Sequence, residues 1–375
     1  MPTQKSKTNY ALKNALALKK IAQIGDNLAK NLVSYCGGID AVFKEKKVAL
    51  SKIPGIGLLR AESIIKFNDW DIIDQEIRFT EKYNIDIITY LDASYPYRLK
   101  AHSDSPFLLF KKGNADLNAA RMISIVGTRN MSNYGKESIQ QLVNDLATYK
   151  ASIISGLALG VDTQAHKDAL LHKLPTIGVL GHGFSTFYPA QNKKLAEEMI
   201  RTDGALITDY FSFVPGNPEN FPSRNRIVAS LCDALIVIES AHSGGSMITA
   251  ELANSYDKLT FAIPGNTYQK YSQGCNLLIK LNKANLYDNI GDIIYHLNWD
   301  KHPIEQKHQI SLFEELSNDE KTVLAALNKA GVPIDEIYYQ TKIAMSKLSL
   351  ILLDLELKNV VKVLPGKKFA IAARY

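Results

Sequence analysis

The stretch Met122-Ile123-Ser124-Ile125-Val126-Gly127-Thr128-Arg129 is a nearly continuous apolar run that ends in a glycine, a hydroxyl residue and a cation. Six more apolar, β-rich runs follow it, at 151–154, 177–180, 205–207, 234–238, 259–263 and 284–286. Amphipathic stretches of about 10 to 15 residues, long enough for helices, follow these runs. Short apolar strands that alternate with helices indicate a parallel sheet covered on both faces. The sequence therefore predicts an α/β fold with a Rossmann-like, doubly wound parallel sheet.

The residues directly after these runs are mostly glycines and small hydroxyl residues. They occupy positions 127–129, 155–157, 181–183, 208–210, 239–245 and 264–266. The carboxyl ends of parallel strands meet at one edge of the sheet, where open α/β sheets bind their ligands. Glycine lets a ligand approach the backbone, whose N–H groups can then hold an anion. We therefore expect a nucleotide or nucleic-acid site along this edge.

A second concentration of charge lies in Phe221-Pro222-Ser223-Arg224-Asn225-Arg226. Proline is tolerated in the first turn of a helix, where its missing N–H would have no partner. We expect Arg224, Asn225 and Arg226 on this opening turn, beside free N–H groups and the positive end of the helix dipole. Phe221 adds a face on which a base can stack, which favours a nucleotide or single-stranded nucleic acid over simple phosphate. The alternative is a helix start whose arginines pair with nearby carboxylates.

The charge of the 375-residue chain is unevenly distributed. Residues 1–67 hold 12 Lys and Arg against 4 Asp and Glu, whereas residues 68–315 hold 23 against 28. Residues 316–375 hold 9 against 6, and the formal net charge of the whole chain is +6. Because the central part is mildly acidic, an anion site there must be local, built from a few arginines and backbone dipoles.

Composition also indicates where the protein works. No apolar run approaches the roughly 20 residues that span a bilayer, so we expect no membrane partner. The start of the chain lacks the apolar core of a signal peptide. Three cysteines, Cys36, Cys232 and Cys275, lie far apart without a C-x-x-C pair. This usage predicts neither structural disulfides nor zinc, and it favours the reducing cytoplasm.

The flanking regions predict two further domains. Residues 1–67 are mostly helical in pattern, and Ile53-Pro54-Gly55-Ile56-Gly57 resembles the turn of a helix-hairpin-helix in a SAM-like domain. Such glycines let backbone N–H groups approach a DNA phosphate, but many of these hairpins only pack against partners, so both roles stay open. Residues 68–297 form the extended Rossmann-like domain, which includes two short β-like runs at 85–91 and 106–110.

The C-terminal part follows a polar, proline-bearing segment, 298–315, which we interpret as a linker. Residues 316–375 have the pattern of three helices and a β-hairpin, which predicts a winged helix. Its expected recognition helix carries little positive charge. DNA binding and a role in protein interaction or dimerisation therefore both stay open for this domain.

Signatures of the common catalytic sites are missing. Residues 127–136 end in Gly-Lys, but the spacing and Glu137 do not fit a Walker A loop, and no G-x-G-x-x-G follows the first strand. His166 and His172 lack a metal-binding spacing and are interpreted as core or surface histidines. We expect no catalytic residue, no metal and no cofactor.

One enzymatic alternative remains from the sequence. Residues 243–251 look like a relative of the P-G-G-x-G-T-x-x-E loop of LOG-type nucleotide phosphoribohydrolases, although Ser243 and Met247 replace the first proline and the third glycine. Glu251 would then be the candidate acid/base, or it could be a carboxylate on a helix face. A nucleotide sensor is a third possibility.

Taken together, these motifs resemble the DprA (Smf) family, the DNA-processing protein A of bacterial natural transformation. The matching segments occur in the family's order at 125–129, 134–135, 155–166, 181–192, 221–227, 243–250, 264–266 and 274–279. The predicted flanking domains match as well, so the resemblance covers the whole chain. Two positions depart from the family pattern: Leu159 occupies a position that is often basic, and Thr208-Asp209-Tyr210 replaces Ser-Glu-Tyr.

The resemblance implies a function and a set of site residues. It implies single-stranded DNA (ssDNA) binding at the strand ends, protection of incoming DNA, loading of the RecA recombinase, and a homodimer formed through the Rossmann-like domain. Arg129 would hold a phosphate, and Phe221 would stack on a base. The full expected DNA-binding set is Gly127, Thr128, Arg129, Ser155, Gly156, Phe221, Arg224, Asn225, Arg226, Ser243, Gly244 and Gly265.

Overall fold

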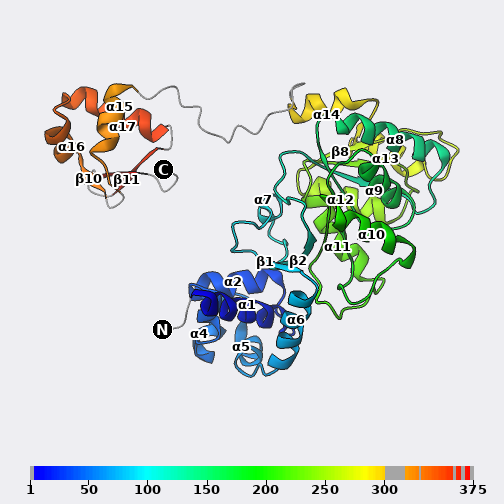
Figure 1. Cartoon of the computed structure of the whole chain (residues 1–375), viewed down its shortest axis with the longest axis horizontal. Helices are drawn as coiled ribbons and strands as arrows, with labels where there is room; N and C mark the ends of the chain where they lie inside the picture. The colour runs from blue at the N-terminus through cyan, green and yellow to red at the C-terminus, as the bar shows by residue number, and fades with distance from the viewer. Residues whose placement is uncertain (1–3, 300–316, 329–330, 358–359, 365–367, 372–375) are drawn as a thin grey trace. The chain divides into compact units, whose positions relative to one another are not determined.

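The computed structural model describes residues 4–299, 317–328, 331–357, 360–364 and 368–371. The chain divides into two compact units, Met1–Pro303 and Ile304–Tyr375 (Figure 1). The predicted linker, 298–315, lies mostly outside the described residues. Among the described residues, no helix has both the length and the apolar character needed to cross a membrane.

A nine-stranded sheet forms the centre of the first unit, in the order β1-β2-β6-β5-β4-β3-β7-β8-β9. Its strands are β1 (Asp86–Thr89), β2 (Leu108–Gly113), β3 (Met122–Val126), β4 (Ser152–Ser155), β5 (Thr176–Val179), β6 (Ala205–Thr208), β7 (Ala234–Val237), β8 (Leu259–Ala262) and β9 (Asn285–Leu286). The seven strands from β3 to β9 are parallel, whereas β1 and β2 pair antiparallel at one edge. All seven strands predicted from the apolar runs are confirmed, each within one residue of its expected bounds.

Two layers of helices cover the sheet. Along β3, Met122 and Val126 pack into one apolar cluster and Ile123 and Ile125 into another, because side chains alternate between the faces of a strand. The first cluster includes α11 (Asn220–Ser230), α12 (Gly245–Ser255) and α13 (Gln273–Lys280). The second includes α8 (Asn133–Ala147), α9 (Val161–Leu171) and α14 (Ile290–Leu297), while α10 (Lys193–Arg201) packs in a smaller cluster. The predicted doubly wound fold is confirmed.

The N-terminal helices gather next to β1 and β2 (Figure 1). They are α1 (Gln4–Lys20), α2 (Asp26–Cys36), α3 (Ile39–Val42), α4 (Lys47–Ser51), α5 (Gly57–Ile65) and α6 (Trp70–Lys82), and a short helix α7 (Tyr97–Lys100) follows β1. Their apolar side chains share one core with Phe107, Phe110 and Phe211 from the edge of the sheet. A domain boundary at residue 67 therefore stays a prediction.

The predicted helical hairpin lies between α4 and α5. Gly55 and Gly57 in its turn have φ values of +82° and +62°, a conformation that suits glycine. The guanidinium of Arg60 donates to the carbonyls of Gly55 (2.8 Å) and Gln23 (3.1 Å), so it joins this turn to the α1–α2 turn. DNA contact by the hairpin stays a prediction.

The second unit has the elements expected of a winged helix. They are α15 (Asn318–Ala325), β10 (Val332–Pro333), α16 (Ile334–Thr341), α17 (Met345–Leu357), β11 (Val361–Leu364) and β12 (Lys368–Ile371). The strands form a sheet in the order β10-β12-β11, and Leu348, Leu352 and Leu355 of α17 pack into the core. The turn of the predicted β-hairpin, between β11 and β12, lies outside the described residues.

His166 is a core histidine, one of the two alternatives that the sequence left open. It is fully buried on α9, with Nδ1 2.7 Å from the Oγ1 of Thr176 and no partner at Nε2. Burial, with a smaller contribution from the charge of Arg224, lowers the pKa of His166 to about 3. In the folded protein His166 is therefore a neutral imidazole at neutral pH.

This burial predicts a loss of stability in mild acid. An unfolded histidine takes up a proton below about pH 6.5, whereas the folded one stays neutral down to about pH 3, so the unfolded state binds more protons. From pH 7 to pH 5 we expect His166 alone to reduce the free energy of unfolding by about 2 kcal/mol. Urea unfolding at both pH values checks this, and His166→Asn should show a smaller pH dependence. An unchanged pH dependence in that variant would contradict the assignment.

Candidate nucleic-acid interface

A cavity of about 780 Å³ opens at the carboxyl ends of β3 and β7. These two strands are neighbours in the sheet, yet the chain proceeds outward from them in opposite directions. Such a switch point leaves a crevice in which open α/β sheets bind ligands. Residues 127–130, 221–222, 224–225, 240–241 and 243–246 contribute to its wall.

The loop after β3 is fixed from two sides. The N–H of Thr128 donates to the carbonyl of Glu239 (2.7 Å), and the carbonyl of Thr128 accepts from the N–H of Val161 (3.2 Å) at the start of α9. A Cβ at Gly127 would lie 2.6 Å from Cγ2 of Val161, so this close approach requires glycine. The loop is therefore a rigid support for the residue that follows it.

Arg129 is the exposed cation of the cavity wall. No carboxylate among the described residues forms an ion pair with it. A guanidinium that is not engaged by the protein is available to a phosphate, which it can hold through two parallel hydrogen bonds.

Arg224 also lines the cavity, but the protein uses most of its donors. It is 5% exposed, and its Nη1 donates to the carbonyls of Gly156 (2.5 Å) and Val179. A Cβ at Gly156 would lie 2.6 Å from Nη2 of Arg224 and 2.7 Å from Oδ2 of Asp162. A side chain at position 156 would therefore clash with Arg224. The buried Arg224 links the backbone after β4 to the end of β5 through its two carbonyl hydrogen bonds.

Two aromatic rings form one wall of the cavity. Phe221 and Tyr188 both line it, with ring centroids 5.5 Å apart and planes inclined by 44°. Tyr188 is 50% exposed, so its face is accessible to a ligand. Adjacent rings of this kind are sequence-tolerant stacking surfaces for bases.

Another part of the wall contains the start of helix α12. Ser243 and Gly244 precede the helix, which begins at Gly245, and all three line the cavity. The N–H groups of the first helical turn have no partners within the helix, and the helix dipole favours an anion there. The side-chain amide of Asn225 donates to the carbonyl of Gly245 (3.3 Å), which ties α11 to this wall.

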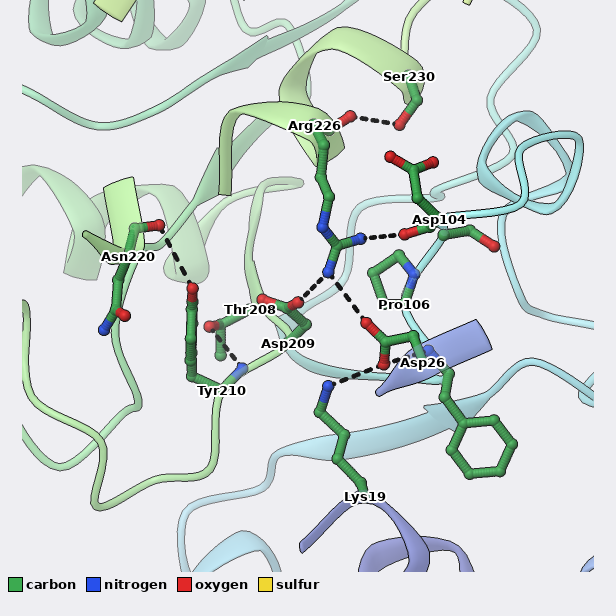
Figure 2. Close-up of polar contacts among 12 residues, drawn as sticks. Lys19, Asp26, Asp104, Pro106, Thr208, Asp209, Tyr210, Asn220, Arg226 and Ser230 are labelled. Atoms are coloured by element: carbon green, nitrogen blue, oxygen red, sulfur yellow. Dashed lines mark hydrogen bonds and ion pairs between the residues drawn. The ribbon is translucent and has the colours of Figure 1, made fainter. Parts of the chain in front are cut away.

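The structure does not bring Arg226 into the cavity. Figure 2 shows its guanidinium among carboxylates: it donates to Asp209 (2.5 Å), to Asp26 (3.2 Å) and to the carbonyl of Asp104 (2.7 Å). Asp26 also pairs with Lys19 at 3.0 Å. This is the alternative that the sequence left open, an arginine paired with nearby carboxylates. We therefore no longer propose Arg226 as a DNA ligand.

The opening-turn prediction for residues 224–226 is wrong, for a simple reason. Helix α11 begins at Asn220, so Pro222 lies in the first turn as expected but the arginines lie one turn later. Successive helical positions point in different directions. Arg224 consequently lines the cavity while Arg226 points away from it.

Two other expected residues lie outside the cavity lining. Ser155 is fully buried and its hydroxyl donates to the carbonyl of Ile125 (2.6 Å). The N–H and carbonyl of Gly265 are both bound by the side chain of Asn276, at 3.2 and 2.8 Å. Nine of the expected set do line it: Gly127, Thr128, Arg129, Gly156, Phe221, Arg224, Asn225, Ser243 and Gly244.

The expected set lacked several polar or aromatic lining residues, among them Asn130, Tyr188 and Tyr271. Tyr188 stood within one of the matched segments, 181–192, so its aromatic character next to Pro189 was a usable signal. Tyr271 comes from the connection between β8 and α13. No local pattern distinguishes it from a surface tyrosine.

The candidate acid/base of the enzymatic alternative does not reach the cavity. The side chain of Glu251 is 62% exposed on α12, its carboxylate lies 3.7 Å from the ammonium of Lys283, and it is not part of the lining. It fits the helix-face alternative. Leu159, which departs from the family pattern, is 39% exposed and lines a small pocket that Arg129 and Tyr188 also border.

The doubly wound sheet, the switch-point cavity and the winged helix define an α/β protein with a Rossmann-like fold and a candidate nucleic-acid site. Comparisons with known proteins identify the class more closely. The family model of DNA recombination-mediator protein A matches residues 86–298, and that of the DprA winged helix domain matches residues 313–367. The chain belongs to the DprA/Smf family of DNA-processing proteins.

Individual relatives agree with this assignment. The DNA processing protein DprA of Streptococcus pneumoniae is 34% identical over 73% of this chain and 93% of its own length. The protein Smf of Escherichia coli is 31% identical over 94% of this chain and 93% of its own length. The X-ray structure of the S. pneumoniae protein aligns with a TM-score of 0.65 at 30% identity, covering 79% of this chain and 98% of that one.

A second solved structure concerns ligand binding. It is described as showing the unique single-stranded DNA binding mode of DNA processing protein A from Helicobacter pylori. It aligns with a TM-score of 0.52 at 28% identity and covers 59% of this chain and 98% of that one.

Proposed function

We propose that this protein is a cytoplasmic ssDNA-binding recombination mediator, which protects a single strand and loads the RecA recombinase onto it. The observation that carries the proposal is one cavity that combines the unpaired Arg129, the aromatic wall of Phe221 and Tyr188, and the start of α12. The ssDNA binding described for the H. pylori relative supports it.

The proposed contacts are with backbone and base faces, not base edges. Arg129 and the first turn of α12 hold phosphates, and Phe221 with Tyr188 stacks bases. Such contacts make binding tolerant of sequence and dependent on salt. We propose further that the protein acts as a homodimer through its Rossmann-like domain and without catalysis. The position of Glu251 outside the cavity supports the absence of hydrolase chemistry.

The test is fluorescence anisotropy with labelled oligo-dT at several salt concentrations, in competition with unlabelled duplex of equal length. We expect single-strand binding that survives duplex competitor and weakens as salt rises. Equal affinity for duplex would contradict the proposal. Loading is tested separately, as a shorter lag in ATP hydrolysis by RecA on a strand coated with single-strand-binding protein.

A substitution in the aromatic wall tests the stacking role. Phe221→Ala should weaken oligo-dT binding about tenfold, because base–aromatic stacking contributes roughly 1–3 kcal/mol per base. Phe221→Trp should retain most of the affinity, since it keeps a stacking face. Phe213, which is 47% exposed and does not line the cavity, provides the matched control as Phe213→Ala. Equal affinities for both alanine variants would exclude stacking on Phe221.

A further inference from the structure

The cavity contains few positively charged side chains that could bind the phosphates of a DNA strand. Its lining contains two arginines and no lysine. In Arg224, Nη1 donates to two backbone carbonyls and Nε donates to the side-chain oxygen of Asn225. Arg129 is left as the exposed cation. A strand that extends beyond one or two nucleotides brings further phosphates, so additional cations have to lie at the cavity's edge.

The connection between β8 and α13 supplies such a cation beside an aromatic pair. We call residues 266–271 the rim loop. Tyr271 lines the cavity, and the ammonium of Lys270 lies 5.7 Å from the centroid of its ring. Tyr268 is 94% exposed, the most exposed of the large apolar and aromatic side chains described. Residues 266–270 are all exposed.

Hydrogen bonds hold the rim loop in place, although residues 266–270 are exposed to solvent. Before it, Gly265 is held by Asn276 through two hydrogen bonds, and the hydroxyl of Tyr134 donates to the carbonyl of Pro264 (2.8 Å). Within it, the N–H of Tyr268 donates to the side-chain oxygen of Asn266 (2.9 Å). A fixed loop loses little conformational freedom when a ligand binds to it.

The loop is also tied directly to the cavity. The carbonyl of Tyr271 accepts from the N–H of Ser240 (2.6 Å), at the end of β7. The hydroxyl of Tyr271 accepts from the side-chain amide of Asn130 (3.0 Å), the residue next to Arg129. The last residue of the rim loop, Tyr271, therefore contacts the loop that carries Arg129.

We infer that the rim loop is an outer subsite of the ssDNA site. Tyr268 stacks on the base of a nucleotide outside the cavity, and Lys270 binds an adjoining phosphate. This inference rests on the proposed function and extends it, because it sets the number of nucleotides bound by one protomer. An aromatic residue alternating with a cation is the combination that non-specific single-strand sites use.

The experiment measures affinity against oligonucleotide length. Oligo-dT of two, four, six and ten nucleotides competes for the full-length protein and for Tyr268→Ala, Lys270→Ala and the double variant. We expect the shortest oligomer to bind all proteins alike and the longer ones to bind the double variant about tenfold more weakly. Lys270→Ala should also reduce the slope of log affinity against log salt by about 0.7, as expected for one phosphate contact on a single strand.

Matched controls separate the subsite from a general effect of charge or aromatic content. Tyr295→Ala removes a tyrosine that is 79% exposed on α14, and Lys280→Ala removes an exposed lysine on α13. Tyr268→Trp and Lys270→Arg should restore binding of the longer oligomers. Unchanged binding of every length by the double variant would overturn this inference alone. Failure of the unaltered protein to bind ssDNA would overturn it together with the proposed function.

Discussion

Arg129→Ala should weaken ssDNA binding roughly a hundredfold, the largest loss from any single change in the cavity wall. Charge-assisted hydrogen bonds contribute roughly 1.5–3 kcal/mol each, and a tenfold change in affinity corresponds to about 1.4 kcal/mol. A guanidinium can make two such bonds to one phosphate. Because Arg129 is exposed and no described carboxylate pairs with it, its loss leaves no buried charge behind. The variant should therefore unfold at the same urea concentration as the unaltered protein.

The salt dependence distinguishes a lost phosphate contact from a disturbed cavity. Anisotropy at several salt concentrations gives the slope of log affinity against log salt concentration. For Arg129→Ala this slope should be smaller by about 0.7, because each phosphate neutralised on a single strand contributes about that amount. Arg129→Lys should recover the slope and part of the affinity. Arg201→Ala removes an exposed arginine at the end of α10 and serves as the control. A hundredfold loss with an unchanged slope would indicate that Arg129 acts by shaping the cavity.

The fold was predictable because its strands are buried on both faces. A strand covered by helices on both sides must be apolar along its whole length, so β3 and its parallel neighbours stand out as short uninterrupted runs. The position of the N-terminal helices against the sheet was harder to predict, because it depends on packing between residues that are distant in the sequence. Phe107 and Phe110 face the N-terminal helices across the edge of the sheet, and nothing in their local sequence indicates that partner.

The site was predictable where a strand end determines the position of a residue. Arg129 follows the end of β3 by three residues and Phe221 lies in the first turn of α11, and both line the cavity. The local sequence did not predict the position of Arg226. Its guanidinium is held by two carboxylates that lie 17 and 200 residues away along the chain. Only the folded structure brings Asp26 of α2 and Asp209 after β6 to the same guanidinium.

Arg226→Ala should cause the largest loss of stability, about 3–5 kcal/mol in the free energy of unfolding. Removing one partner of a buried ion pair leaves the other charge without compensation, and that cost is typically of this size. Here two carboxylates are affected, Asp26 at the start of α2 and Asp209 directly after β6 (Figure 2). The guanidinium side chain is 15% exposed, so solvent replaces little of the lost interaction. Urea unfolding measures the change, with Arg201→Ala again as the exposed control.

The same network gives the expected dependence on pH. Burial alone would raise the pKa of Asp26, but Lys19, Arg226 and the N–H of Phe107 together hold it below its ordinary value of 3.8. A carboxyl with a lowered pKa stabilises the fold above that ordinary value, and this contribution is lost as the pH falls through the folded value. Without Arg226 the pKa of Asp26 should rise, so acid unfolding should begin at a higher pH. Asp26→Asn should remove this contribution, since an amide does not titrate.

DNA binding by Arg226→Ala decides between the two roles that the sequence left open for this arginine. If Arg226 is an anchor, the variant should bind oligo-dT with nearly unaltered affinity at temperatures where it remains folded, while Arg129→Ala shows the opposite pattern of full stability and weak binding. The two variants thus separate the phosphate ligand from the residue that joins α2 to α11. Full stability with a large loss of ssDNA affinity in Arg226→Ala would restore the original prediction that Arg226 holds the DNA backbone.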